Sequence, residues 1–163
     1  MNHLNVFNNP YYRWWYPNYW LKNIKMFIRS IKYAYQRITR GWANCDTWDL
    51  DDYYEHIIAD TLNYLADNHM GYPGNNEFPD DEIWTKYLKD MAQKFYNANE
   101  SNGAYPTPEA DKWWKWIEEH DNNEENPYVA SMFKESNEND KKRDKDMHEG
   151  MKMLDHVFWN LWD

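Results

Sequence analysis

The chain has little of the sequence material that defines familiar enzymes and secreted proteins. Its one cysteine, Cys45, cannot form an internal disulfide, which fits a reducing compartment. Its five glycines form neither the Gly-x-Gly-x-x-Gly nor the Walker phosphate-binding pattern, and there is no nucleophile elbow. No apolar run is long enough to span a membrane, and residues 1–10 lack the features of a secretory signal. We therefore expect a cytoplasmic protein without a cofactor, outside these enzyme classes.

Large aliphatic side chains are also scarce. Leu, Ile, Val and Phe make up 25 of 163 residues, and the formal net charge is −10, a composition typical of disorder. The aromatic residues reverse this interpretation. The chain has 11 Trp and 14 Tyr, and each large aromatic ring buries about 150–250 Å² when it packs. We predict one ordered domain over residues 1–163 with an aromatic-rich core.

Charge is distributed unevenly along the chain. Residues 1–45 contain seven Lys or Arg and no Asp or Glu, whereas residues 46–163 contain 11 Lys or Arg and 28 Asp or Glu. The two parts therefore carry +7 and −17. Such asymmetry indicates a charged partner or packing of the basic part against the acidic part.

Apolar residues recur at helical spacing, and no alternating strand pattern competes with them. After an aromatic arm at residues 1–17, we predict helices over about 18–40, from Asp46 or Thr47 as cap to about 69, and over 80–97. We also predict helices over 107–120 and 140–161, with a short one at 127–134. Gly41 and the turn at 71–74 end the first two, and Thr107 and Pro108 start the fourth. The fold class is all-α, a single-domain bundle of four or five helices.

Each predicted helix has an apolar face that we expect to point inward. The residues of these faces, in chain order, are Ile24, Ile28, Ile31, Tyr35 and Ile38; Leu50, Tyr54, Ile57, Ile58, Leu62 and Leu65; Trp84, Tyr87, Leu88, Met91 and Phe95; Trp113, Trp114 and Ile117; and Met147, Met151, Leu154, Phe158 and Leu161.

The basic face of the first predicted helix is the candidate ligand site. Arg binds phosphate through a bidentate fork, and aromatic rings stack on nucleobases. We assign ligand binding to Arg29, Arg37, Arg40, Trp42 and Trp48. The alternative is that this face is solvated or lies against the acidic remainder, which is the commonest outcome for amphipathic helices.

Other sites have weaker support. We expect no membrane partner, although basic aromatic helices can rest on anionic lipid, because the protein is acidic and the apolar face should be needed for the core. Duplex DNA is not expected, since one basic helix is a small footprint. A metal site could be built from Glu55, His56, Asp60, His148, Glu149 and His156, but the Glu-x-x-His spacing of bundle metal sites is missing, and we assign no metal. Cys45 could be an activated nucleophile, but we favour its interpretation as a small buried thiol.

Residues 40–53, which read Arg-Gly-Trp-Ala-Asn-Cys-Asp-Thr-Trp-Asp-Leu-Asp-Asp-Tyr, carry a family resemblance. The run resembles the signature of small uncharacterised helical proteins from tailed bacteriophages, prophages and gut metagenomes. That signature is Arg-Gly-aromatic, then Asp-x-Trp-x-Leu-Asp, then a Gly-x-Pro turn, matched here by Asp46, Trp48, Leu50, Asp51 and Gly71-Tyr72-Pro73. Residues 84–95 and 149–163 are also similar. Cys45 and Leu154-Asp155 depart from it.

The resemblance implies an all-helical phage protein that works in the bacterial host cytoplasm, and it brings no catalytic residues. Our leading hypothesis is a non-enzymatic binding protein that counters host defence by sequestering a phosphorylated small molecule such as a nucleotide signal. One alternative is an acidic inhibitor of a host protein, which imitates nucleic acid. Another is a structural or assembly protein. A homo-oligomer is compatible with all three, and Arg40 could pair with Asp51 across the first helical corner.

Overall fold

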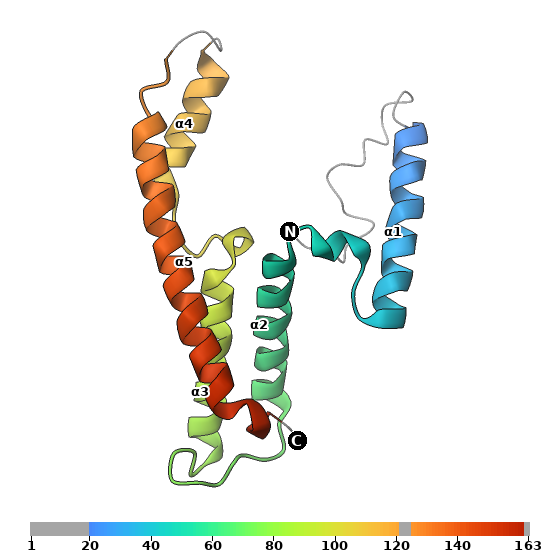
Figure 1. Cartoon of the computed structure of the whole chain (residues 1–163), viewed down its shortest axis with the longest axis vertical. Coiled ribbons are helices and arrows are strands. Elements are labelled where there is room, and N and C mark those ends of the chain that lie inside the picture. The colour runs from blue at the N-terminus through green and yellow to red at the C-terminus, as the bar shows by residue number, and fades with distance from the viewer. Residues whose placement is uncertain (1–19, 121–124, 162–163) are drawn as a thin grey trace. The chain divides into compact units, whose positions relative to one another are not determined.

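A computed structural model describes residues 20–120 and 125–161 of the chain, which are helical and loop segments without a strand (Figure 1). Five α-helices account for most of them, and single 3₁₀ turns lie between or after them. The elements are α1 (Trp20–Arg40), η2 (Asn44–Thr47), α2 (Leu50–Asn68), α3 (Asp81–Ala98), η3 (Glu100–Asn102), α4 (Pro108–Glu119), α5 (Val129–Val157) and η4 (Phe158–Asn160). The prediction of an all-α bundle of four or five helices is confirmed. The predicted arm at residues 1–17 lies outside the described residues.

The chain forms two compact units, residues 1–53 and residues 54–163. The first contains α1, η2 and the start of α2. The second contains the rest of α2 and the helices α3, α4 and α5. We describe each unit by itself, and the prediction of one domain over residues 1–163 stays a prediction.

The core of the second unit is centred on α3, whose predicted inward face is confirmed. Trp84, Leu88, Met91 and Phe95 are buried, and Tyr87 packs against the same cluster. Phe78, from the loop before α3, meets the rings of Trp84 and Tyr87 edge-on, with both centroid distances 4.9 Å. The predicted aromatic contribution to the core is therefore present. It is joined by smaller side chains of α2, namely Ala59, Leu62 and Ala66.

Helix α5 packs against two helices in turn, with α4 beside its first half and α3 beside its second half (Figure 1). Both pairs run antiparallel. The Tyr87 hydroxyl donates to the Met153 carbonyl at 3.1 Å, and Lys94, two turns later on α3, pairs with Asp146, two turns earlier on α5. We predicted two helices, at 127–134 and 140–161, where the chain forms one. Residues 135–139, between the two predicted helices, are Glu, Ser and Asn. The packing of α4 and α3 along α5 overrides the weak helix propensity of Ser and Asn there.

Gly150 sets how closely α3 and α5 approach. It is buried, and an added Cβ would lie 3.2 Å from both Lys94 Cβ and Phe95 Cε2. Phe95 has no exposed surface, so its ring is enclosed by the core and any shift of the ring would disturb the packing there. This contact explains a glycine in the middle of a long helix, where glycine costs about 1 kcal/mol relative to alanine.

The N-termini of α3 and α4 are capped in different ways. Asp80 caps α3 by accepting the Ile83 N–H at 2.9 Å. Pro108 is in the first turn of α4 as predicted, but Thr107 makes no side-chain cap. Glu135 of α5 replaces it and accepts the N–H groups of Glu109 and Ala110 at 3.0 and 3.1 Å. A carboxylate from a neighbouring helix satisfies the same free donors and suits the positive end of the helix dipole.

Several residues predicted to point inward are exposed instead. On α1 the whole predicted face is exposed, and Asn23, on the opposite side, is the buried residue. The prediction is also wrong for exposed residues of α2, α4, α5 and η4, which are Leu50, Tyr54, Ile57, Trp114, Met151 and Phe158. Helical periodicity identifies an apolar face but not the surface that covers it. Among residues 20–120 and 125–161, no helix combines the length and apolarity needed to cross a membrane.

Candidate functional site

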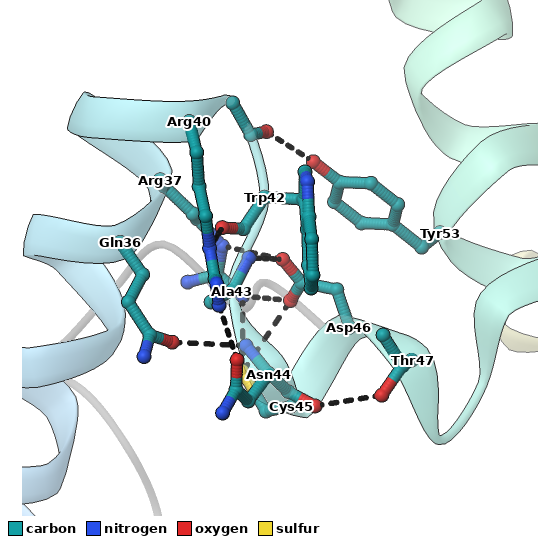
Figure 2. A network of polar contacts seen from close by, with 11 residues as sticks. Gln36, Arg37, Arg40, Trp42, Ala43, Asn44, Cys45, Asp46, Thr47 and Tyr53 are labelled. Atoms are coloured by element: carbon teal, nitrogen blue, oxygen red, sulfur yellow. Dashed lines mark hydrogen bonds and ion pairs between the residues drawn. The ribbon is translucent and has the colours of Figure 1, made fainter.

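The candidate site begins where α1 stops. Gly41 has a φ of +82°, in the left-handed region that favours glycine, and its N–H donates to the Arg37 carbonyl at 2.9 Å. The predicted stop at Gly41 is confirmed. The chain then turns through Trp42 and Ala43 into η2, so that residues of the last turn of α1 and of η2 face each other. We call the set Arg37, Arg40, Trp42, Asn44 and Asp46 the arginine corner (Figure 2).

An ion pair between Arg37 and Asp46 holds the arginine corner together. Arg37 Nε donates to Asp46 Oδ2 at 3.2 Å, and Arg37 Nη2 pairs with Asp46 Oδ1, so the contact is bidentate. Asp46 Oδ2 also accepts the Ala43 N–H at 2.6 Å. The Asp46 side chain is only 5% exposed and that of Arg37 19%. The sequence predicted Asp46 or Thr47 as the cap of α2, but Asp46 caps η2 instead and neutralises Arg37.

Electrostatics keeps this pair charged. Burial opposes ionisation of Asp46, but hydrogen bonds from Arg37, Ala43 and Cys45 outweigh it and hold the pKa of Asp46 below its usual value. Burial likewise opposes the charge on Arg37, and the hydrogen bond and negative charge of Asp46 raise the pKa of Arg37 despite it. The positive charge of Arg37 is therefore compensated by Asp46 within the protein.

Arg40 is arranged differently, with its guanidinium stacked on an aromatic ring. Its Cζ lies 3.9 Å from the centroid of Trp42, and both side chains are exposed (Figure 2). Arg40 Nε donates to the Trp42 carbonyl at 3.0 Å, and Nη2 donates to Asn44 Oδ1. The predicted pairing of Arg40 with Asp51 is not formed; the acidic partner at this corner is Asp46, and it binds Arg37. Arg40 thus keeps its positive charge at the surface.

Two further bonds fix the loop that carries Trp42. Gln36 Oε1 accepts the Asn44 N–H at 2.9 Å, and the Tyr53 hydroxyl donates to the Gly41 carbonyl at 2.7 Å (Figure 2). These bonds tie the loop to α1 on one side and to the first turn of α2 on the other. A ring held in this way loses little freedom when a ligand packs on it.

Of the five predicted ligand residues, three meet at the arginine corner and two flank it. Arg37, Arg40 and Trp42 lie together, as described. Trp48 closes η2 and is 87% exposed. Arg29 is exposed on α1, two turns before Arg37 and about 12 Å from it along the helix axis. The described surface therefore consists of the Arg40–Trp42 stack, with Arg29 before it and Trp48 after it in the sequence.

The sequence analysis missed the residues that build the corner without being basic or aromatic. Gln36, Asn44 and Tyr53 had no assigned role, and Asp46 was assigned a different one. A signal for Asp46 existed, because it is the first acidic residue of the chain and follows the basic segment directly. A buried arginine needs a carboxylate, and the Gly41 turn brings this one back beside α1.

The thiol and the histidines do not form a reactive site in the described residues. The Cys45 thiol donates to Asp46 Oδ1 at 3.4 Å, and burial and the Asp46 carboxylate raise its pKa, which disfavours the nucleophilic thiolate. The histidines considered as ligands each pair with a separate carboxylate: His56 with Asp60, His148 with Asp144 and His156 with Glu77. Within the described ranges, no three His, Cys, Asp or Glu side chains gather as a metal site would require.

A second polar cluster links α3 and α5 in the other unit. Lys94 Nζ donates to Asp146 Oδ1 at 2.8 Å and to Glu149 Oε2 at 2.5 Å, and the Tyr105 hydroxyl donates to the buried Asp146. The two hydrogen bonds of Lys94 raise its pKa, and the one to Glu149 holds the pKa of Glu149 below its usual value. Because the Lys94 ammonium on α3 lies between two carboxylates of α5, next to the Gly150 contact, we interpret this cluster as a structural bridge.

Comparisons with known protein families, with characterised proteins and with solved structures gave no match to this chain.

Proposed function

We propose that the protein is a non-enzymatic binding protein and that its arginine corner binds the phosphate of a small molecule such as a nucleotide. The observation that carries the proposal is the exposed stack of Arg40 on Trp42, 3.9 Å apart. An indole face beneath a guanidinium fixes the plane of the cation and leaves its outer edge for an anion.

The hydrogen bonds of Arg40 support this role. A guanidinium has five N–H donors. Arg40 uses one on the Trp42 carbonyl and one on Asn44, which leaves three. Arg40 is exposed, and its remaining N–H donors suit the oxygens of a phosphate. Helix α1 contains no Asp or Glu that would compete for them.

The other residues have distinct roles in this proposal. Arg37 is a positioning residue, because its fork is occupied by Asp46 and it holds η2 against α1. Trp48, which is largely exposed, supplies a stacking surface for a base. Arg29 lies far enough along α1 to hold a further phosphate group of a nucleoside polyphosphate.

The biological setting follows from the family resemblance. For a phage protein without a catalytic constellation, holding a nucleotide away from a host receptor is a function that needs affinity and no turnover. We therefore propose sequestration of a nucleotide signal as counter-defence in the host cytoplasm.

Isothermal titration calorimetry of the full chain with ATP, a cyclic dinucleotide and inorganic phosphate tests the proposal. Arg40→Ala should weaken nucleotide binding about ten- to hundred-fold, the range expected for charge-assisted hydrogen bonds. Arg40→Lys should recover part of the loss, since a point charge replaces the fork. Arg143→Ala, the same exchange on α5, is the matched control and should bind as the unaltered chain does. Equal affinities for Arg40→Ala and Arg143→Ala would overturn the proposal.

A further inference from the structure

Helix α1 carries an apolar stripe that the described structure leaves exposed. Its six residues are between 48% and 83% exposed: Leu21, Ile24, Ile28, Ile31, Tyr35 and Ile38. The opposite side of the same helix contains Asn23, which is buried, and Tyr33 and Arg37, which are half-buried. The helix therefore buries its more polar side and presents its most apolar side outward. Such a face is a sign of an interaction surface.

The spacing of the stripe identifies the kind of partner. Its residues follow one another at intervals of 3, 4, 3, 4 and 3 positions. This is the heptad pattern, with Leu21, Ile28 and Tyr35 at positions a and Ile24, Ile31 and Ile38 at positions d. A repeat of 3.5 residues gives a narrow seam that suits a second helix wound around the first, whereas a helix lying on a globular core has a wider apolar face.

We propose that α1 of one chain pairs along this seam with α1 of further copies of the same chain, in parallel. The flanking positions support this occupant. Lys25 and Lys32 occupy positions e, and Phe27 and Ala34 occupy positions g. In a parallel coil each g residue faces the next e residue of the neighbouring helix, so Phe27 meets Lys32 of the second copy and no two cations meet there. An antiparallel pair would set the lysines against each other.

The residues at positions d indicate the number of copies. Ile24, Ile31 and Ile38 are all β-branched, and Leu21 stands at the first a position. Isoleucine at d, with leucine or isoleucine at a, favours three or four strands over two. The seam covers three a/d pairs, which is short, so the association should be concentration-dependent.

Charge gives the association an unusual salt dependence. Helix α1 carries six Lys or Arg and no Asp or Glu. Copies packed side by side repel one another through these cations, and salt screens the repulsion. Self-association should therefore strengthen as salt rises. Binding of an acidic partner helix or of an anionic lipid surface to the same seam would instead weaken as salt rises. This inference does not depend on nucleotide binding.

Sedimentation equilibrium of the full chain, without nucleotide, at about 0.05 and 0.5 M NaCl tests this inference. The chain should form trimers or tetramers, tighter at high salt, and Ile31→Lys should be monomeric. Ile83→Lys, the same exchange at an exposed site on α3, is the matched control and should associate like the unaltered chain. A monomer under every condition, or association that weakens with salt, would contradict the proposal, and so would co-sedimentation of a monomer with phosphatidylglycerol vesicles.

The orientation has its own test in the same protein. With Leu21→Cys, a parallel coil in register brings equivalent thiols together at the first a position, and mild oxidation should yield disulfide-linked dimers. The unaltered chain, whose one cysteine is the half-buried Cys45, is the control. If the chain associates but Leu21→Cys gives no more cross-linked dimer than this control, the parallel arrangement is wrong.

Discussion

At the scale of residues, the buried carboxylate of Asp46 organises the arginine corner. It accepts bonds from Arg37, from the Ala43 N–H and from the Cys45 thiol. Removing one partner of such a pair leaves the other charge without compensation, which costs more than the pair itself contributes. The loop that carries Trp42 therefore depends on a residue whose carboxylate is buried.

Asp46→Asn should lower the free energy of unfolding of the first unit by about 2–3 kcal/mol at neutral pH, less than for a fully buried pair because Arg37 is partly exposed. The pKa of Asp46 is held below its usual value in the folded state. The Asp46 carboxylate therefore stabilises the fold fully above its unfolded-state pKa, about 4. This stabilisation is lost as the pH falls through the lower folded-state pKa.

Urea unfolding followed by circular dichroism at several pH values measures this effect. The difference between Asp46→Asn and the unaltered chain should shrink steadily from pH 5 downward. Asp49→Asn, at an exposed position three residues later, is the control and should stay within about 0.5 kcal/mol at every pH. A difference that does not change with pH would show that the Asp46 charge is not responsible.

The scale of elements shows where sequence patterns succeed and where they fail. The bounds of α3 and the end of α1 at Gly41 agree with the prediction, because caps and glycine stops are local signals. We could not predict that the helices expected at 127–134 and 140–161 form the single helix α5, since this depends on α3 and α4 packed alongside it. The cap of α4 came from Glu135, a residue 26 positions away from Glu109, which no local pattern contains.

Gly150 gives a prediction at this scale, since it controls the spacing of two helices. Gly150→Val should destabilise the second unit by about 2–3 kcal/mol, because the added methyl groups would meet Lys94 Cβ and the buried ring of Phe95. Thermal unfolding followed by circular dichroism measures the loss. Ser136→Val, at an exposed position of the same helix, controls for the low helix propensity of valine and should change stability by less than about 1 kcal/mol. Equal losses in the two variants would rule out the close contact as the reason for the glycine.

At the scale of the whole molecule, charge is separated between the two units. Residues 1–53 carry seven Lys or Arg and four Asp or Glu, a net +3, and residues 54–163 carry 11 and 24, a net −13. The sequence showed this asymmetry directly. The helical spacing of apolar residues also predicted the all-α fold, and composition predicted the aromatic cluster in the core. It did not show that the apolar stripe of α1 is exposed, because a core face and an interface have the same periodicity.

The candidate site was predictable to a similar extent. The residue types in the basic segment identified Arg40 and Trp42, which form the exposed stack. They also identified Arg37, which the fold uses internally, because composition cannot distinguish a free cation from one paired across a turn. The different roles of Arg37 and Arg40 become clear only from the structure, in which the turn at Gly41 brings Asp46 next to Arg37.

The most direct test of the central claim, that the arginine corner holds a phosphorylated ligand, is native mass spectrometry of the full chain with added nucleotides. We predict a non-covalent adduct that is released on denaturation, absorbs at nucleobase wavelengths and is lost in Arg40→Ala but kept in Arg143→Ala. The same spectrum without nucleotide reports the number of chains, so self-association and ligand binding are read separately. An apo mass alone with every nucleotide tested, in the unaltered chain and in both variants, would contradict the account.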